Sequence, residues 1–117
     1  MNTQETLNLD RLTTELNHKT QEILGNKLQK IILFGSYARG DYTEHSDIDL
    51  MVLADYEETE RRTLEKAMVR LASYASLDYD ITVSITLNTE DFVSRHIHLS
   101  PFYRNVLSEG VEIYANN

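Results

Sequence analysis

The chain has no cysteine and only one proline among its 117 residues. Without cysteine, neither a disulfide framework nor a thiolate metal site is available, and the absence fits a reducing cytoplasm. No apolar run reaches the roughly 18 residues that a membrane span needs, and the polar N-terminus lacks the hydrophobic segment of a secretion signal. We therefore expect a cytoplasmic protein with no membrane partner.

Positive charge is also scarce. There are 11 Lys and Arg residues against 19 Asp and Glu residues, which gives a formal net charge of −8. Such a chain is repelled by a phosphate backbone unless it gathers its cations in one place, and the sequence shows no Lys/Arg stripe. We therefore expect no direct binding of nucleic acid, whereas a divalent cation or a basic protein is a compatible partner.

At 117 residues the chain is long enough for one domain. Apolar spacing predicts, in chain order, helix 9–24, strands 30–34 and 47–54, helix 57–76, strand 78–87, helix 88–96 with Asn88 as its N-cap, a helix from Ser100–Pro101 to Gly110, and a candidate edge strand 111–115. This order predicts an α/β (α+β) fold in which helices pack on a small mixed β-sheet.

A glycine and a serine follow the first predicted strand, in the stretch "LFGSYARG". Gly35 can turn the chain sharply, and the backbone N–H groups after it, with the Ser36 hydroxyl, can hold an anion such as a phosphate. The same two residues also suit an ordinary capped helix start. The pair "GS" alone does not separate these two interpretations.

Two aspartates, Asp47 and Asp49, stand at the start of the second predicted strand. Residues i and i+2 of a strand point to the same face, so the two carboxylates lie close together and repel each other. A divalent cation removes that repulsion, and carboxylate oxygens suit Mg²⁺ or Mn²⁺. The alternative is a solvated junction between loop and strand, with both acids facing water.

A third carboxylate stands near the start of the third predicted strand, in "LDYDITVSI". Asp80 precedes the apolar alternation, so it can join Asp47 and Asp49 if the two strands are neighbours. Asp78 lies two residues earlier, so in a strand its side chain would point to the same face as that of Asp80, and it is the rival candidate. Three aspartates that face a Gly-Ser turn are the arrangement of a two-metal site for phosphoryl transfer.

These motifs, "GS", then "DID", then a further Asp, resemble the polymerase-β-like nucleotidyltransferase superfamily over residues 30–115. The short length and the closing "SPFYRNVLSEGVEIYA" resemble its minimal nucleotidyltransferase (MNT) group, which pairs as antitoxin with HEPN-domain toxins. The resemblance implies one domain over 1–117, with an N-terminal helix in 1–26, a catalytic core in 30–86, and C-terminal helices with a candidate edge strand in 88–117.

The resemblance also implies residue roles. Gly35 and Ser36 would bind the phosphates of ATP, Asp47 and Asp49 would hold two Mg²⁺ ions (or Mn²⁺), and Asp80 would share one ion and help to deprotonate the acceptor. Arg39 either contacts a phosphate or is a surface residue. Ser46 is a candidate for nucleotide binding, with a local backbone hydrogen bond as its alternative.

The implied function is that of an antitoxin that transfers AMP from ATP to a hydroxyl, expected to be a tyrosine, of a HEPN RNase toxin. Two alternatives stay open. The first is an antitoxin that acts by binding alone. The second is a nucleotidyltransferase for small molecules such as aminoglycosides, which is disfavoured because such enzymes carry a further helical domain.

Overall fold

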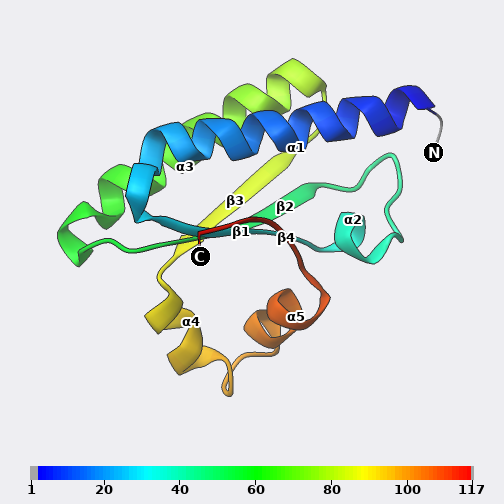
Figure 1. Cartoon of the computed structure of the whole chain (residues 1–117). Coiled ribbons are helices and arrows are strands. Elements are labelled where there is room, and N and C mark those ends of the chain that lie inside the picture. The colour runs from blue at the N-terminus through cyan, green and yellow to red at the C-terminus, as the bar shows by residue number, and fades with distance from the viewer. Residues whose placement is uncertain (1–2, 117) are drawn as a thin grey trace.

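The computed structural model describes residues 3–116 and reveals a mixed α/β fold (Figure 1). Its helices and strands are α1 (Thr3–Leu24), β1 (Leu28–Phe34), α2 (Ser36–Arg39), β2 (Ile48–Ala54), α3 (Arg61–Tyr79), β3 (Val83–Asn88), α4 (Glu90–His96), α5 (Pro101–Glu109) and β4 (Val111–Ala115). Short 3₁₀ segments lie at Gly25–Lys27 and Glu58–Glu60.

The four strands form one mixed sheet in the order β3-β2-β1-β4. β1 pairs antiparallel with β2 and with β4, whereas β2 and β3 run parallel and are joined through α3. Figure 1 shows α1 and α3 on one face of the sheet, α4 and α5 on the other, and α2 beyond the end of β1. The predicted fold class, a small mixed sheet with helices packed on it, is confirmed.

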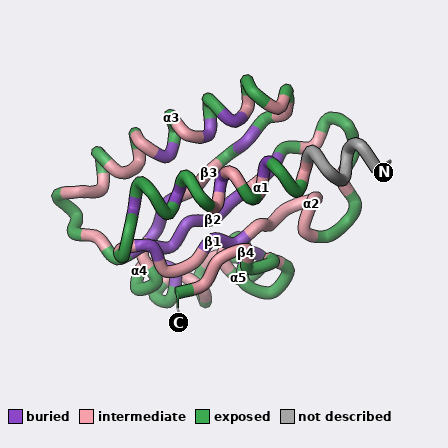
Figure 2. Tube along the Cα trace, turned by 45° about the horizontal axis from the view of Figure 1, so that its top comes forward, coloured by how far each residue is buried: buried purple, intermediate pink, exposed green. Residues whose placement is uncertain are grey.

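Strand β2 is the centre of the core, because every residue in it except Asp49 is buried. Ile48, Leu50 and Val52 belong to a cluster with apolar residues of α1 and α3, whereas Met51 and Leu53 pack with residues of α4 and α5. Figure 2 shows the buried residues concentrated along the strands and on the inward sides of the helices. Strand alternation therefore directs Asp49 toward the face that carries α4 and α5.

The third strand differs from the prediction at its beginning. Helix α3 continues to Tyr79, whose ring packs against the core and whose hydroxyl donates to Glu15 Oε2 at 2.7 Å. Asp80 then ends the helix in a left-handed conformation (φ 53°), and β3 starts only at Val83. The predicted strand 78–87 is therefore wrong over its first five residues.

The helix that follows β3 also starts one residue later than expected. Thr89, not Asn88, is the N-cap, and its hydroxyl oxygen accepts a hydrogen bond from the N–H of Phe92 at 3.0 Å. Asn88 is instead the buried last residue of β3. The boundaries of α5 at Ser100 and Gly110 and the edge strand β4 are confirmed.

Within residues 3–116, no helix is both long enough and apolar enough to cross a lipid bilayer.

Candidate active site

Gly35 brings the turn after β1 into contact with the acidic strand β2. Its backbone adopts φ 78° and ψ −156°, a region that is essentially restricted to glycine. A Cβ atom at this position would lie 2.6 Å from Asp49 Oδ2. Glycine is therefore required here twice, once for the backbone conformation and once for the space that the Asp49 carboxylate occupies.

Helix α2 consists of a single turn that directly follows Gly35. The N–H of Arg39 donates to the carbonyl oxygen of Gly35 at 3.1 Å, and this is the first hydrogen bond of the turn. Backbone N–H groups at the start of a helix point outward from its N-terminal end. Backbone N–H groups in such a turn, together with the half-buried Ser36, can hold a phosphate.

Asp47 and Asp49 form a repelling pair at the start of β2. Asp49 is half-buried beside Phe34 of β1, whereas Asp47 is exposed in the loop that leads into the strand. Burial, and after it the negative charge of Asp47, raises the pKa of the Asp49 carboxyl above its ordinary value, and the positive charge of Arg39 opposes this shift. The structure thus brings these two predicted residues together next to Gly35.

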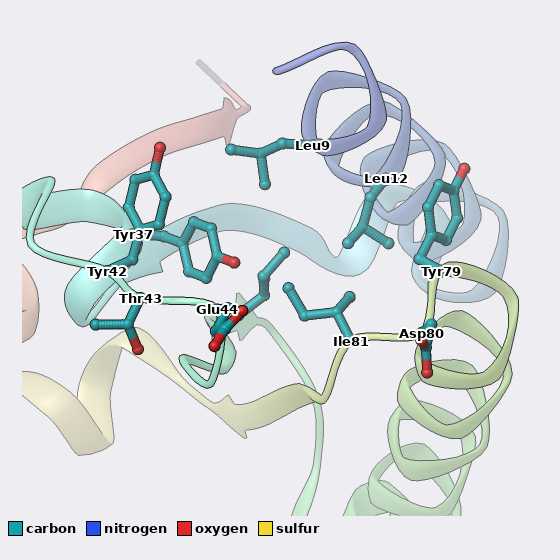
Figure 3. A pocket seen from close by; sticks show the side chains of 10 residues that line it. Leu9, Leu12, Tyr37, Tyr42, Thr43, Glu44, Tyr79, Asp80 and Ile81 are labelled. Atoms are coloured by element: carbon teal, nitrogen blue, oxygen red, sulfur yellow. The ribbon is translucent and has the colours of Figure 1, made fainter. Parts of the chain in front are cut away.

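A pocket of about 390 Å³ lies on the opposite side of the sheet from this acidic pair. Figure 3 shows Tyr37 and Tyr42 at one end of the pocket, with Tyr79 and Asp80 at the other end. The two rings at the first end are stacked, with centroids 4.4 Å apart. Ile48 also lines the pocket, so strand alternation turns its neighbour Asp49 away from it.

The structure does not place Asp80 with the other two aspartates. Asp80 caps α3 and lines the pocket just described, on the side of the sheet where Ile48 lies. The rival Asp78 is an exposed residue of α3 and lines a groove between α3 and α1. Across the part of the chain that the structure describes, no three His, Asp or Glu side chains form a group that could hold a metal ion. The structure therefore brings Asp47 and Asp49 together, and it places Asp80 at the end of α3.

Strand β3 presents hydroxyl residues beside the acidic pair, and the sequence analysis did not single them out. Ser84 is the register partner of Asp49, and the carbonyl oxygen of Thr82 accepts a hydrogen bond from the N–H of Ile48 at 2.9 Å. A signal for this exists in the sequence, because the apolar residues Val83, Ile85 and Leu87 alternate with Thr82, Ser84 and Thr86. The alternation identifies the residues that share the face of Asp49.

Arg39 and Ser46 both have protein partners. The guanidinium of Arg39 lies 3.2 Å from Asp41 Oδ2 and 3.5 Å from Glu109 Oε2, and the hydrogen bond to Asp41 is the main cause that raises the pKa of Arg39. The hydroxyl oxygen of Ser46 accepts a hydrogen bond from the N–H of Thr43 at 2.8 Å, which shapes the loop before Asp47. Arg39 thus connects the loop after α2 to the end of α5.

The sequence and the fold both match known proteins. The family described as "Polymerase beta, Nucleotidyltransferase" matches residues 18–117. A protein of Methanocaldococcus jannaschii, named as a candidate protein adenylyltransferase, is 33% identical over 108 residues, which are 92% of this chain and 100% of that protein. A second protein of that organism with the same kind of name is 43% identical over 60% of this chain and 69% of its own length.

Two solved toxin–antitoxin structures have a similar fold. One, described with AMP-PNP, has a TM-score of 0.58 and 24% identity, and the match covers 88% of this chain and 73% of that one. The other is a mutant of the pair MntA–HpeT, with a TM-score of 0.55 and 26% identity over 89% of this chain and 73% of that one. With a family match over most of its length, the chain belongs to the polymerase-β nucleotidyltransferase family.

Proposed function

We propose that this protein is a cytoplasmic, Mg²⁺-dependent protein adenylyltransferase that acts as an antitoxin by transferring AMP from ATP to a hydroxyl group of a toxin. The observation that carries the proposal is the contact between Gly35 and Asp49, because it joins a turn suited to phosphate to a carboxylate pair. The relatives are named as candidate protein adenylyltransferases, and these names support the reaction. The toxin–antitoxin pair MntA–HpeT supports the biological role.

The proposed partner is a HEPN-domain RNase toxin, and the proposed acceptor is a tyrosine. A domain of this size has little material with which to enclose an acceptor, so a large acceptor that brings its own surface fits it. The net charge of −8 favours association with a more basic partner.

Asp47 and Asp49 are the residues that would hold the divalent ions. Their four carboxylate oxygens are the hard ligands that Mg²⁺ and Mn²⁺ prefer. Burial, and after it the charge of Asp47, raises the pKa of Asp49, and a bound cation would offset both effects. Two carboxylates leave coordination positions for phosphate oxygens and water. When bound, such ions neutralise the negative charge that develops during phosphoryl transfer.

The roles of the remaining residues follow from their places around this pair. The turn after Gly35 and the Ser36 hydroxyl would hold the β- and γ-phosphates of ATP. The acceptor oxygen attacks the α-phosphorus in line, the bond from that phosphorus to the bridging oxygen breaks, and pyrophosphate leaves while the acceptor proton passes to solvent. Arg39 holds the loop that carries Asp47 through its ion pair with Asp41.

Incubation of the protein with Mg²⁺, labelled ATP and its toxin tests this proposal. The label should appear on the toxin with the wild type and disappear with the Asp47→Asn/Asp49→Asn double variant. An antitoxin that acts by binding alone would neutralise the toxin without any label. Absence of label with every nucleotide tried, while the two proteins form a complex, would contradict the enzymatic proposal.

A further inference from the structure

Strand β3 presents hydroxyl groups, not carboxylates, to the face of the sheet that holds Asp49. The strands β2 and β3 run parallel, with Ile48 beside Val83 and Asp49 beside Ser84. Ile48 and Val83 both belong to the core cluster under α1 and α3. Because neighbouring residues of a strand point to opposite faces, Asp49 and Ser84 point together to the other face.

We propose that Ser84 takes the third position of the cation site, beside Asp49, so that this chain binds divalent ions with two carboxylates and one hydroxyl. The proposal rests on the proposed function, since it concerns the same site. It predicts that a divalent cation binds weakly to the free protein and firmly only when a nucleotide supplies phosphate oxygens.

The two other carboxylates considered for this position lie elsewhere. Asp80 caps α3 in a left-handed conformation and lines the pocket on the Ile48 side of the sheet. Asp78 belongs to α3 and lines the groove between α3 and α1. Among the side chains that the structure describes, in residues 9–116, no third acidic or histidine side chain joins Asp47 and Asp49 in a group that could hold a metal ion.

The connection between α3 and β3 keeps Asp80 at the end of the helix, before the strand begins. The hydroxyl oxygen of Ser76 accepts a hydrogen bond from the N–H of Val83 at 2.9 Å, and the N–H of Ile81 bonds to the carbonyl oxygen of the same Ser76 at 3.3 Å. These bonds hold residues 80–82 against the end of the helix. The chain becomes a strand only after it has passed Asp80.

A hydroxyl in the third position changes the electrostatics of the site. Two carboxylates attract a divalent cation less strongly than three would, because each added negative charge close to the ion strengthens binding. Ser84 is exposed, so an aspartate at this position has room to reach the same face. A gain in cation affinity from Ser84→Asp is therefore the expected signature of the third position.

Titration with Mn²⁺, followed by electron paramagnetic resonance without nucleotide, tests the proposal. Ser84→Asp should bind Mn²⁺ at least about tenfold more tightly than the wild type, because ligand charge sets the affinity of such sites. Asp80→Asn, which changes a residue outside the proposed site, should bind like the wild type. A non-hydrolysable ATP analogue should raise the affinity of the wild type more than that of Ser84→Asp.

Several results would overturn the assignment. A loss of Mn²⁺ affinity in Asp80→Asn would make Asp80 the third ligand, and an unchanged affinity in a folded Ser84→Asp would exclude Ser84. If thermal unfolding shows that Ser84→Asp does not fold, the Asp80→Asn titration and the nucleotide dependence of the wild type decide. The Mn²⁺ titration needs no acceptor protein. A failed AMP-transfer assay together with a successful titration would therefore refute the proposed function, whereas the assignment of Ser84 to the cation site would stand.

Discussion

The carboxylate of Asp49 occupies the space into which a side chain at Gly35 would project, with Oδ2 only 2.6 Å from the position of that Cβ. Gly35, the last residue before α2, thus leaves free the space that the side chain of Asp49, the second residue of β2, occupies. This contact joins the two sequence motifs, because Gly35 belongs to "GS" and Asp49 belongs to "DID".

Replacing Gly35 by alanine should damage both stability and nucleotide binding. The backbone conformation alone costs about 1–3 kcal/mol for a residue other than glycine, and the Cβ atom would also displace the Asp49 carboxylate. Gly40→Ala is the matched control, because Gly40 has a positive φ of 85° but, among the residues that the structure describes, no atom within 4 Å of its Cβ position. Urea unfolding and nucleotide binding should both be worse in Gly35→Ala than in Gly40→Ala; equal effects would contradict the predicted contact.

Asp49→Asn should leave the metal-free protein as stable as the wild type or make it more stable at neutral pH. Burial and the charge of Asp47 raise the pKa of Asp49 in the folded state, so the ionised carboxylate opposes folding. This penalty is present above the raised pKa and disappears as the pH falls below the ordinary value of 3.8. Thermal unfolding at several pH values with a chelator measures it. A variant less stable than the wild type at pH 7 would show that the charge has a stabilising partner.

Ser36→Ala should weaken nucleotide binding more than Ser46→Ala does. Ser36 opens the turn beside Asp49, and loss of one hydrogen bond to a charged phosphate costs about 1.5–3 kcal/mol, or roughly tenfold to a hundredfold in affinity. The hydroxyl oxygen of Ser46 is engaged with the N–H of Thr43, so its loss acts on the loop. Calorimetric titration with an ATP analogue and Mg²⁺ compares the two variants. A larger loss in Ser46→Ala would assign the phosphate contact to the loop.

Thr89→Ala should destabilise the protein by about 1 kcal/mol, which is typical for loss of an N-cap side chain. The Thr89 hydroxyl caps α4 through the N–H of Phe92. Ser100→Ala is the comparison, because within residues 3–116 the Ser100 side chain makes no capping hydrogen bond to α5. The free energies of unfolding in urea should therefore differ, and equal losses would indicate that both hydroxyls cap their helices.

Much of the fold can be predicted from the pattern of apolar residues and from the residues that mark the ends of helices. The continuous apolar run of β2 indicates a strand covered on both faces, and Ser100, Pro101 and Gly110 mark the limits of α5. The position of Asp49 beside the Gly35 turn follows from the same patterns.

The position of Asp80 could not be predicted from these patterns. The segment "LDYD" continues the helical spacing of α3 through Tyr79 and also has the parity of the strand that follows. Parity predicts a shared face only while the chain is extended. Here a left-handed residue that is not glycine ends the helix, and hydrogen bonds to Ser76 bend the next residues. The register between β2 and β3, which places Ser84 beside Asp49, begins only after this bend.

The most direct test of the central claim is the intact mass of the toxin after co-expression with this protein. We predict that the wild type adds mass in steps of one AMP, on a tyrosine, and that the Asp47→Asn/Asp49→Asn variant adds none although it still binds the toxin. An unmodified toxin beside an active wild-type antitoxin, or equal modification by the double variant, would contradict the proposed reaction.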